Sequence, residues 1–255
     1  MDRRPTLLVL GGTTEAVQLA QRLAPQVGPH LDLITSFAGR TARPTAPAGT
    51  VRVGGFGGVD GLAAYLRATP VDLVVDALHP FAAVMPFHAA EACARAGVDL
   101  LKLQRPPWTP VAGDRWIEVA DAGAAAEAVR HAAGRRVLLT IGRQELGPFR
   151  SITGPAFLVR SIEATDLAGA WTAVELLGRG PFPLEDERKL LRTEEIDLVV
   201  TKNSGGAATA AKLTAARERA TPVVVVQRPA TPSVPLVETV DEALAWIGER
   251  VQLPG

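Results

Sequence analysis

The chain has 255 residues, of which 47% are hydrophobic and 21% charged, and its 27 Lys and Arg residues balance its 27 Asp and Glu residues. This composition is typical of a compact globular protein and excludes an intrinsically disordered one. A net charge of zero argues against a nucleic-acid binder that relies on bulk electrostatics. The only cysteine is Cys93, which excludes an internal disulfide and any zinc or iron–sulfur site made of several cysteines.

Short strand-like runs rich in β-branched residues and leucine alternate with alanine-rich amphipathic runs along the chain. The predicted strands are residues 6–10, 31–35, 51–53, 72–76, 100–103, 115–119, 136–140, 157–160, 197–201 and 222–226. The predicted helices are residues 15–24, 60–68, 81–96, 122–133, 183–192, 206–219 and 240–249. Continuously apolar strands need a sheet that is covered on both faces, and alternation with helices predicts parallel, right-handed crossovers.

We therefore predict an α/β protein made of two Rossmann-like domains, with mainly parallel sheets flanked by helices and a ligand cleft between the domains. The proline-rich segment 105–110 is the best candidate for the boundary. This places one Rossmann-like domain at residues 1–112 and a second at residues 113–255.

Other features narrow the cellular setting. No apolar run approaches the roughly 20 residues that cross a bilayer, and the N-terminal segment leads into a strand and a glycine turn rather than a signal peptide. We expect a cytoplasmic protein, a monomer or weak oligomer, with no nucleic-acid, membrane or metal partner. Cys93 lies in a helical run, where we expect it to act as a buried small hydrophobe.

The first strand is followed by the turn Gly-Gly-Thr-Thr-Glu-Ala at residues 11–16. Gly11 and Ala16 match the dinucleotide fingerprint G-x-G-x-x-G/A, but Thr13 replaces its middle glycine. A turn of this kind, opening a helix, predicts phosphate binding because the helix presents unpaired N–H groups there. The alternative is an ordinary strand-to-helix turn capped by Thr13 or Thr14.

The end of the second strand bears on the choice of nucleotide. An NAD site usually places a carboxylate there for the ribose 2′-hydroxyl, but this chain has Ser36, followed by Arg40 and Arg43. Ser36 and Arg40 are suited to a 2′-phosphate, which favours NADP(H) over NAD(H). The alternative is that both arginines are solvated loop residues.

Two further turns in the first half have open interpretations. Four glycines fall within residues 54–58, and such a segment is either a close-approach site for a ligand or a flexible hairpin. His79 precedes Pro80 at the expected mouth of a helix, where it is as often a capping residue as a catalytic acid.

In the second half, Arg143 directly follows a glycine at the end of a strand, and Lys-Asn-Ser-Gly-Gly at residues 202–206 follows another strand. The second cluster resembles an anion nest reinforced by an ammonium group. An N-cap at Ser204 is the plainer interpretation, but it leaves Lys202 and Asn203 unexplained, which favours ligand contact. Anion sites here, with a nucleotide in the first half, predict a polycarboxylate substrate.

Seven motifs occur in an order that resembles the precorrin-6A reductase family of cobalamin biosynthesis. They are Gly-Gly-Thr-Thr-Glu-Ala at 11–16, Ala-Gly-Arg-Thr at 38–41, Arg-Val-Gly-Gly-Phe-Gly-Gly at 52–58, Asp-Ala-Leu-His-Pro-Phe-Ala at 76–82, Gly-Asp-Arg-Trp at 113–116, Thr-Ile-Gly-Arg-Gln-Glu-Leu at 140–146 and Val-Thr-Lys-Asn-Ser-Gly-Gly at 200–206. The resemblance covers nearly the whole chain. The family commonly has threonine where this chain has Leu78, so a hydroxyl contact at that position is not expected.

The resemblance implies NADPH-dependent reduction of one double bond of precorrin-6A, with hydride added at C19 and a proton at C18, to give precorrin-6B. It implies that the cofactor binds the first domain and that the polycarboxylate tetrapyrrole lies between the domains. The implied cofactor-binding residues are Gly11, Gly12, Thr13, Thr14, Glu15, Ser36, Arg40, Thr41, Gly54 and Gly55. The implied substrate-binding residues are His79, Arg143, Gln144, Lys202, Asn203, Ser204 and Gly205.

No catalytic residue is assigned. His79 and Lys202 are the candidate proton donors, although binding roles are favoured for both, because positioning alone can suffice for hydride addition. Three alternatives stay open: a non-catalytic protein that senses NADP(H), the same reductase acting on a cobalt-containing substrate, and a methyltransferase or sugar-nucleotide enzyme.

Overall fold

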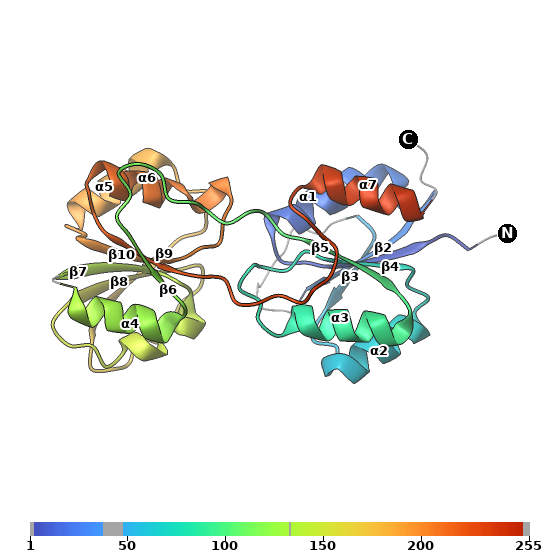
Figure 1. Ribbon diagram of the computed structural model, residues 1–255, viewed down its shortest axis with the longest axis horizontal. Coiled ribbons are helices and arrows are strands. Elements are labelled where there is room, and N and C mark those ends of the chain that lie inside the picture. Colours follow the sequence, from blue (N-terminus) through green and yellow to red (C-terminus); the bar gives the residue numbers. More distant parts are fainter. Residues whose placement is uncertain (1–2, 38–47, 133, 252–255) are drawn as a thin grey trace. The chain divides into compact units, whose positions relative to one another are not determined.

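The computed structural model describes residues 3–37, 48–132 and 134–251, and the chain divides into two compact units (Figure 1). Unit 1 comprises Met1–Pro106 and Pro229–Gly255, and unit 2 comprises Pro107–Arg228. Each unit contains a six-stranded sheet in which neighbouring strands run parallel, with helices on both faces. This confirms the predicted α/β architecture with two Rossmann-like halves.

The sheet of unit 1 has the order β12-β5-β4-β1-β2-β3, which, with β12 as its sixth strand, is the doubly wound arrangement of a Rossmann fold. Its elements are β1 (Thr6–Leu10), α1 (Thr14–Leu23), η1 (Ala24–Gln26), β2 (Asp32–Phe37), β3 (Thr50–Val53), α2 (Gly58–Ala68), β4 (Leu73–Asp76), α3 (Met85–Ala96), β5 (Asp99–Leu103), β12 (Leu236–Val237) and α7 (Val240–Arg250). Helices α1 and α7 cover one face, and α2 and α3 cover the other (Figure 1).

Strand β1 contributes to two cores, one on each face of its sheet. Leu7 and Val9 pack in a cluster with α1 and α7, while Leu8 and Leu10 pack with α2 and α3. Because successive side chains of a strand point to opposite faces, burial on both sides requires the continuous apolar run that the sequence shows.

Cys93 belongs to the second of these cores and is buried, as expected. Its burial, with a smaller contribution from the charge of Asp76, raises the pKa of the thiol to about 12. The thiol is therefore protonated at neutral pH and behaves as a small hydrophobe, which confirms the prediction.

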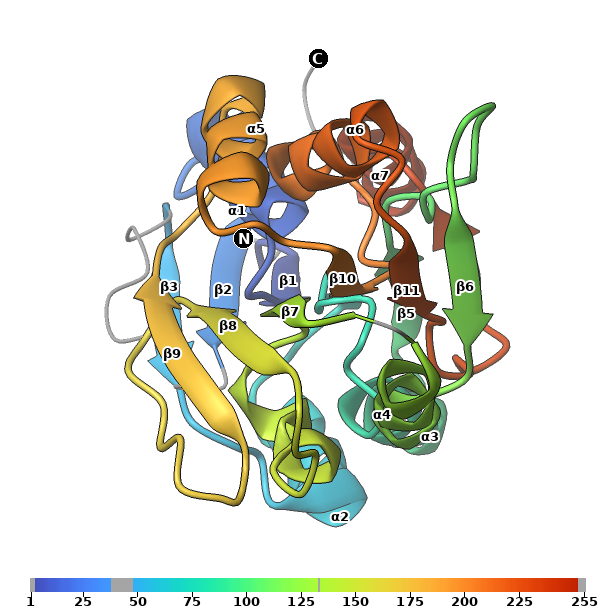
Figure 2. The same cartoon turned by 90° about the vertical axis from the view of Figure 1, so that its left-hand side faces the viewer.

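Unit 2 repeats the arrangement with the order β6-β11-β10-β7-β8-β9 (Figure 2). Its elements are β6 (Trp116–Val119), α4 (Ala122–His131), β7 (Arg136–Thr140), η2 (Arg143–Glu145), η3 (Gly147–Phe149), β8 (Ala156–Ser161), β9 (Thr172–Leu177), α5 (Leu184–Thr193), β10 (Leu198–Lys202), η4 (Ala207–Thr209), α6 (Ala211–Glu218) and β11 (Val223–Val226). Helix α4 covers one face of the sheet, and α5 and α6 cover the other (Figure 1).

The C-terminal segment corrects the predicted domain extents of 1–112 and 113–255. From Pro229 the chain returns to unit 1, where Leu236 of β12 pairs with Lys102 of β5 and Ile247 of α7 is fully buried in the core shared with α1. The first crossing between units falls after Pro106 rather than after residue 112. Strand β12 has two residues, too short for a periodic pattern, so its place in the first sheet was not predicted.

Several elements differ from prediction. The helix expected at residues 81–96 begins only at Met85, because the chain first turns at His79, whose carbonyl accepts a hydrogen bond from the Ala82 N–H at 2.8 Å. The helix expected at residues 206–219 is divided into η4 and α6. Strand β9 was not predicted; it is an edge strand with exposed Val174 and Leu177.

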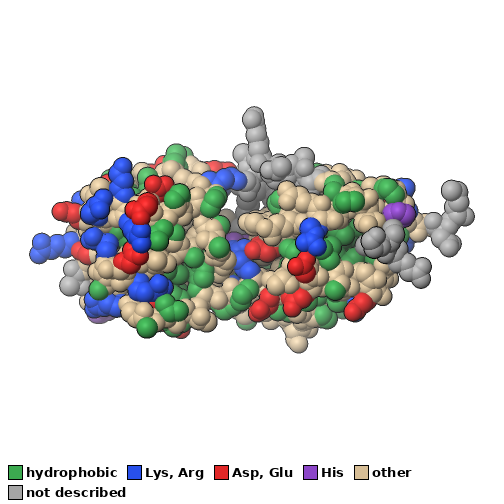
Figure 3. Space-filling view, turned by 90° about the horizontal axis from the view of Figure 1, so that it is seen from above, with side chains coloured by type: hydrophobic (Ala, Val, Ile, Leu, Met, Phe, Trp, Pro, Cys, Tyr) green, Lys and Arg blue, Asp and Glu red, His purple; other side chains and the backbone are tan. Residues whose placement is uncertain are grey.

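Charges on the face over α5 and α6 are interspersed rather than segregated (Figure 3). Arg188 of α5, for example, pairs with Glu218 of α6 at 2.5 Å and with Glu185 one turn earlier. Such exposed pairs contribute little stability, but they balance charge locally. Among the described residues, no helix combines the length and apolar character needed to cross a membrane.

The return of the C-terminal segment predicts that α7 stabilises unit 1. Ile247→Ala removes a fully buried side chain and should lower the free energy of unfolding by about 2–5 kcal/mol, the usual cost of such a truncation. Urea denaturation followed by circular dichroism measures this change. Glu249→Ala on the same helix, with its exposed side chain, serves as the control and should cost little. An equally small effect of Ile247→Ala would contradict the placement of α7 in the core.

Candidate functional site

The turns after β1 and β4 meet at the carboxyl edge of the sheet in unit 1. The two strands are neighbours, yet the helices that follow them, α1 and α3, pack on opposite faces. This makes the edge between them a topological switch point, the place where open α/β sheets bind ligands. The predicted residues Gly11–Glu15 and His79 follow these two strands.

The turn after β1 has open space beside its backbone at Gly12. Gly11 donates its N–H to the Ser36 carbonyl at 2.9 Å, and a Cβ at Gly11 would lie 3.2 Å from Thr35 Cγ2 and 3.3 Å from the Phe37 ring. Gly12 has φ +131°, a conformation that favours glycine, and a Cβ there would meet no atom within 4 Å. The described backbone at Gly12 is thus an open cradle beside the N-terminus of α1, which suits a phosphate group.

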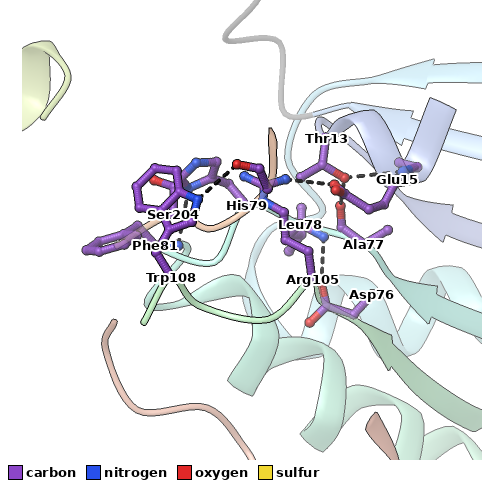
Figure 4. A network of polar contacts seen from close by, with 12 residues as sticks. Thr13, Glu15, Asp76, Ala77, Leu78, His79, Phe81, Arg105, Trp108 and Ser204 are labelled. Carbon is purple, nitrogen blue, oxygen red and sulfur yellow. Dashed lines mark hydrogen bonds and ion pairs between the residues drawn. The ribbon is translucent and has the colours of Figure 1, made fainter. Parts of the chain in front are cut away.

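Thr13 ties this turn to the next one. Its side chain accepts a hydrogen bond from the Ala16 N–H at 3.2 Å, which makes it the N-cap of α1, and its hydroxyl donates to the Ala77 carbonyl at 2.8 Å (Figure 4). The Thr13 hydroxyl is therefore engaged within the protein, as both donor and acceptor. Thr14 is exposed at the start of the helix.

Glu15 has a partner that sequence reasoning missed. Its carboxylate lies 2.7 Å from Arg105 Nη1, and both side chains are mostly buried (Figure 4). Arg105 belongs to the proline-rich segment, which was interpreted only as a domain boundary. Because the pair joins residues 90 positions apart, no local pattern could have revealed it.

A buried ion pair fixes the turn after β4. Lys102 Nζ lies 3.1 Å from Asp76 Oδ2, and both side chains are about 2% exposed. The other carboxylate oxygen accepts the Leu78 N–H at 3.1 Å, so Asp76 holds both the neighbouring strand and its own turn. Breaking such a pair would strand a buried charge, which is costly.

His79 is exposed in this turn rather than at a helix mouth. Its Nδ1 accepts a hydrogen bond from the Phe81 N–H at 3.2 Å (Figure 4). Because Nδ1 is the acceptor, the proton of the neutral ring lies on Nε2, which becomes the hydrogen-bond donor.

Ser36 is buried at the end of β2, and the Arg52 guanidinium donates a hydrogen bond to its hydroxyl at 3.3 Å. The same guanidinium donates to the carbonyls of Gly54 and Gly55. The structure thereby brings together three of the predicted cofactor residues around an arginine that sequence reasoning did not select. The predicted residues Arg40 and Thr41 lie outside the described residues.

In unit 2, the turns after the neighbouring strands β7 and β10 occupy the equivalent positions. Lys202 Nζ lies 2.7 and 3.1 Å from the two carboxylate oxygens of Glu145, so the predicted ammonium already has a counter-ion. Exposed Arg143 pairs with Glu163 at 3.1 Å, and Gln144 is exposed beside it. Glu145 lies in the motif at residues 140–146, but it was not among the predicted site residues.

The Asn203 side chain has a structural partner. Its amide oxygen accepts the Trp108 N–H at 2.8 Å, and its amide nitrogen donates to the Trp108 carbonyl at 3.0 Å. The Trp108 indole donates to the Gly206 carbonyl at 2.9 Å. The segment entering unit 2 is thus fastened to the predicted nest, and the Asn203 amide is directed at that segment.

The nest itself has the backbone shape expected from its glycines. Gly205 and Gly206 have φ of +68° and +78°, and Arg228 donates to the carbonyls of Asn203 and Ser204 at 2.9 and 3.1 Å. Arg228 is a second residue that sequence reasoning missed. Successive backbone turns of this type can direct N–H groups toward an anion.

A buried charged cluster lies next to the nest. Lys212 is buried, donates to the Thr209 carbonyl at 2.7 Å and lies 4.9 Å from the centre of the Trp108 ring. Burial, and secondarily the charge of Arg160, lowers the pKa of Lys212 to about 7, while Glu187 opposes the shift. Arg160 and Glu187 form a buried pair at 2.7 Å.

The shifted pKa makes stability depend on pH. An unfolded lysine has its ordinary pKa of 10.5, so between about 7 and 10.5 the unfolded chain binds more protons than the folded one. Folding free energy should therefore become more favourable as pH rises through this window. In Lys212→Met this contribution disappears, so the native protein should gain stability relative to the variant between pH 6 and pH 10, as measured by urea unfolding. Parallel pH profiles would contradict a depressed pKa.

Among the described residues, no group of three or more His, Cys, Asp or Glu side chains is arranged to hold a metal ion. What the described turns offer is backbone N–H groups, open glycine positions and cationic side chains. This chemistry suits phosphate and carboxylate groups.

A family model, several relatives and a solved structure that resemble this chain all carry the description of a precorrin-6 reductase. The family model described as precorrin-6x reductase CbiJ/CobK matches residues 6–248. A precorrin-6A reductase of Rhodococcus erythropolis is 47% identical over 245 residues, which are 95% of this chain and 97% of that protein. A precorrin-6A reductase of Rhodobacter capsulatus is 43% identical over 249 residues, which are 97% of this chain and 98% of that protein.

A solved structure of CobK precorrin-6A reductase superposes with a TM-score of 0.88 at 43% identity, covering 96% of this chain and 97% of that one. A cobalt-precorrin-6A reductase of Methanothermobacter thermautotrophicus is 29% identical over 234 residues, and the match covers 88% of this chain and 76% of that protein.

Proposed function

The chain belongs to the precorrin-6x reductase family, and we propose that it catalyses the NADPH-dependent reduction of one double bond of precorrin-6A. Hydride is added at C19 and a proton at C18, which gives precorrin-6B in cobalamin biosynthesis. We propose the cytoplasm as its location. The metal-free substrate is preferred over its cobalt-containing counterpart because the precorrin-6A reductases described above share more identity with this chain than the cobalt-precorrin-6A reductase does.

The observation that carries this proposal is the position of the predicted ligand-binding turns. In each unit they follow the two strands that flank the switch point. The open backbone at Gly12, beside the capped N-terminus of α1, suits the pyrophosphate of a dinucleotide. We assign the cofactor to unit 1 and the macrocycle's carboxylate arms to the turns of unit 2.

Bound NADPH would supply the hydride, and the chain's own residues would bind and orient the reactants. Lys202 and Arg143 would meet acetate and propionate groups of the substrate, exchanging part of their contact with Glu145 and Glu163. The His79 ring, with its proton on Nε2, would donate a hydrogen bond to the substrate. His79 and Lys202 remain the candidate proton donors.

The direct test is to mix purified protein with NADPH and precorrin-6A and follow NADPH absorbance. Oxidation of NADPH with formation of a dihydro product supports the proposal. Turnover of the cobalt-containing substrate alone would identify the cobalt-dependent version. Tight NADPH binding without turnover of either macrocycle would indicate a sensor, and binding of S-adenosylmethionine in place of NADPH would indicate a methyltransferase.

Replacing Lys202 tests the substrate assignment. Lys202→Met removes a positive charge from the nest and should raise KM for the macrocycle about tenfold or more, the effect of one charge-assisted hydrogen bond. NADPH affinity should be unchanged, because the residue belongs to the other unit. Lys189→Met, an exposed lysine on α5, is the matched control. An equal loss of NADPH affinity in Lys202→Met would refute the assignment.

Replacing Arg40 tests the cofactor assignment. Arg40→Ala should weaken NADPH binding by about 1–3 kcal/mol, because one charge-assisted hydrogen bond to the 2′-phosphate is lost, while NADH binding should hardly change. Fluorescence titration with both nucleotides measures the difference. Equal losses for the two would show that Arg40 has a structural role.

A further inference from the structure

Arg52 lies on β3, directly across from Ser36 of β2 in the parallel register. Its Nη1 donates to Ser36 Oγ at 3.3 Å and to the Gly54 carbonyl at 2.6 Å, and its Nη2 donates to the Gly55 carbonyl at 2.7 Å. The guanidinium carbon also lies 3.7 Å from the centre of the Phe56 ring. One side chain therefore joins the end of β2 to the glycine segment after β3.

These contacts give the glycine segment a defined conformation. Gly54 has φ +120° and donates its N–H to the Phe37 carbonyl at 2.9 Å, so both of its backbone polar groups are engaged. A Cβ at Gly54 or Gly55 would meet no atom within 4 Å. The segment is thus held from one side by Arg52 while its other side is open, the arrangement expected where a ligand approaches the backbone closely.

Among the described residues, no side chain neutralises the charge of Arg52. No carboxylate among the described residues forms an ion pair with Arg52, in contrast to Lys202, Arg143 and Arg105. A guanidinium has five N–H groups, and three are used in the hydrogen bonds above. Within the part of the chain that the structure describes, the Nε–H and one N–H of Nη2 have no partner.

We propose that Arg52 is a specificity-determining residue of the nucleotide site, where it pairs with the phosphate monoester on the 2′-position of the adenosine ribose. The proposal rests on the NADPH dependence proposed above. The position fits, because Rossmann units recognise this phosphate at the end of the second strand with an arginine nearby. Phe56 and the two glycine carbonyls hold the guanidinium in place, so that little side-chain entropy is lost when the phosphate binds.

The test uses nucleotide fragments that differ in the 2′-phosphate. Calorimetry should show that Arg52→Met weakens binding of 2′,5′-ADP about tenfold or more, while binding of 5′-ADP changes less than about threefold. Arg52→Lys keeps the charge but loses the paired hydrogen bonds, so its affinity for 2′,5′-ADP should lie between the affinities of the native protein and Arg52→Met. Arg67→Met, an exposed arginine on α2, is the matched control and should bind both fragments normally.

The outcomes separate this proposal from the proposed function. Equal losses for 2′,5′-ADP and 5′-ADP would show that Arg52 only supports the glycine segment, and an unchanged preference would show that it does not contact the phosphate. Either result overturns the inference while leaving NADPH dependence intact. If the native protein itself fails to prefer 2′,5′-ADP over 5′-ADP, the proposed cofactor is wrong. Phe56→Leu, which removes the stacked ring without changing charge, should reduce the 2′-phosphate preference by less than Arg52→Met does.

Discussion

The order of strands in each sheet is the constraint on which the candidate site depends. Strands β1 and β4 are neighbours, but the helices that follow them, α1 and α3, pack on opposite faces of the sheet. The connections therefore diverge at the carboxyl ends of these two strands and leave the edge between them open to a ligand. The same order recurs at β7 and β10 of unit 2. The turns that carry the glycines, His79 and Lys202 follow these strands, so their positions are consequences of sheet topology. In unit 1 the edge strand β12 follows the whole of unit 2 in the chain, and in unit 2 the edge strand β6 precedes the other five strands.

Side chains within the sheet edge then make the turns rigid. The Thr13 hydroxyl caps α1 and also donates a hydrogen bond to the turn after β4, so the glycine turn after β1 and the turn that contains His79 share one anchor. The buried ion pair of Asp76 and Lys102 holds the turn after β4 in place. A buried pair is weak evidence for stability, since apolar residues can often replace it. Its value here is that the Asp76 carboxylate also orients the Leu78 N–H, which an apolar residue could not do.

The sequence was sufficient for features that repeat locally and insufficient for those made by distant residues. Continuous apolar strands and glycine turns predicted the two parallel sheets and the turns at their edges, because sheets covered on both faces require such runs. The two residues of β12 carry no period, so the return of the C-terminal segment to unit 1 was not predicted. Glu145, Arg105 and Lys102 escaped notice because each is defined by a partner at least 26 positions away. Asn203 was assigned to ligand because nothing local pointed to the Trp108 backbone.

The pairing of charges bears on the anion sites proposed above for a chain with no net charge. At the strand ends, Lys202 is paired with Glu145, Arg105 with Glu15 and Arg143 with Glu163. An anionic ligand at such a turn must compete with a carboxylate already in place, which a single monoanion does poorly. A ligand with several carboxylates gains more than one contact for one loss of translational freedom, so paired cations select for polyanions. Arg52 differs, because its guanidinium is held by neutral carbonyls and a ring and keeps its full charge for a phosphate.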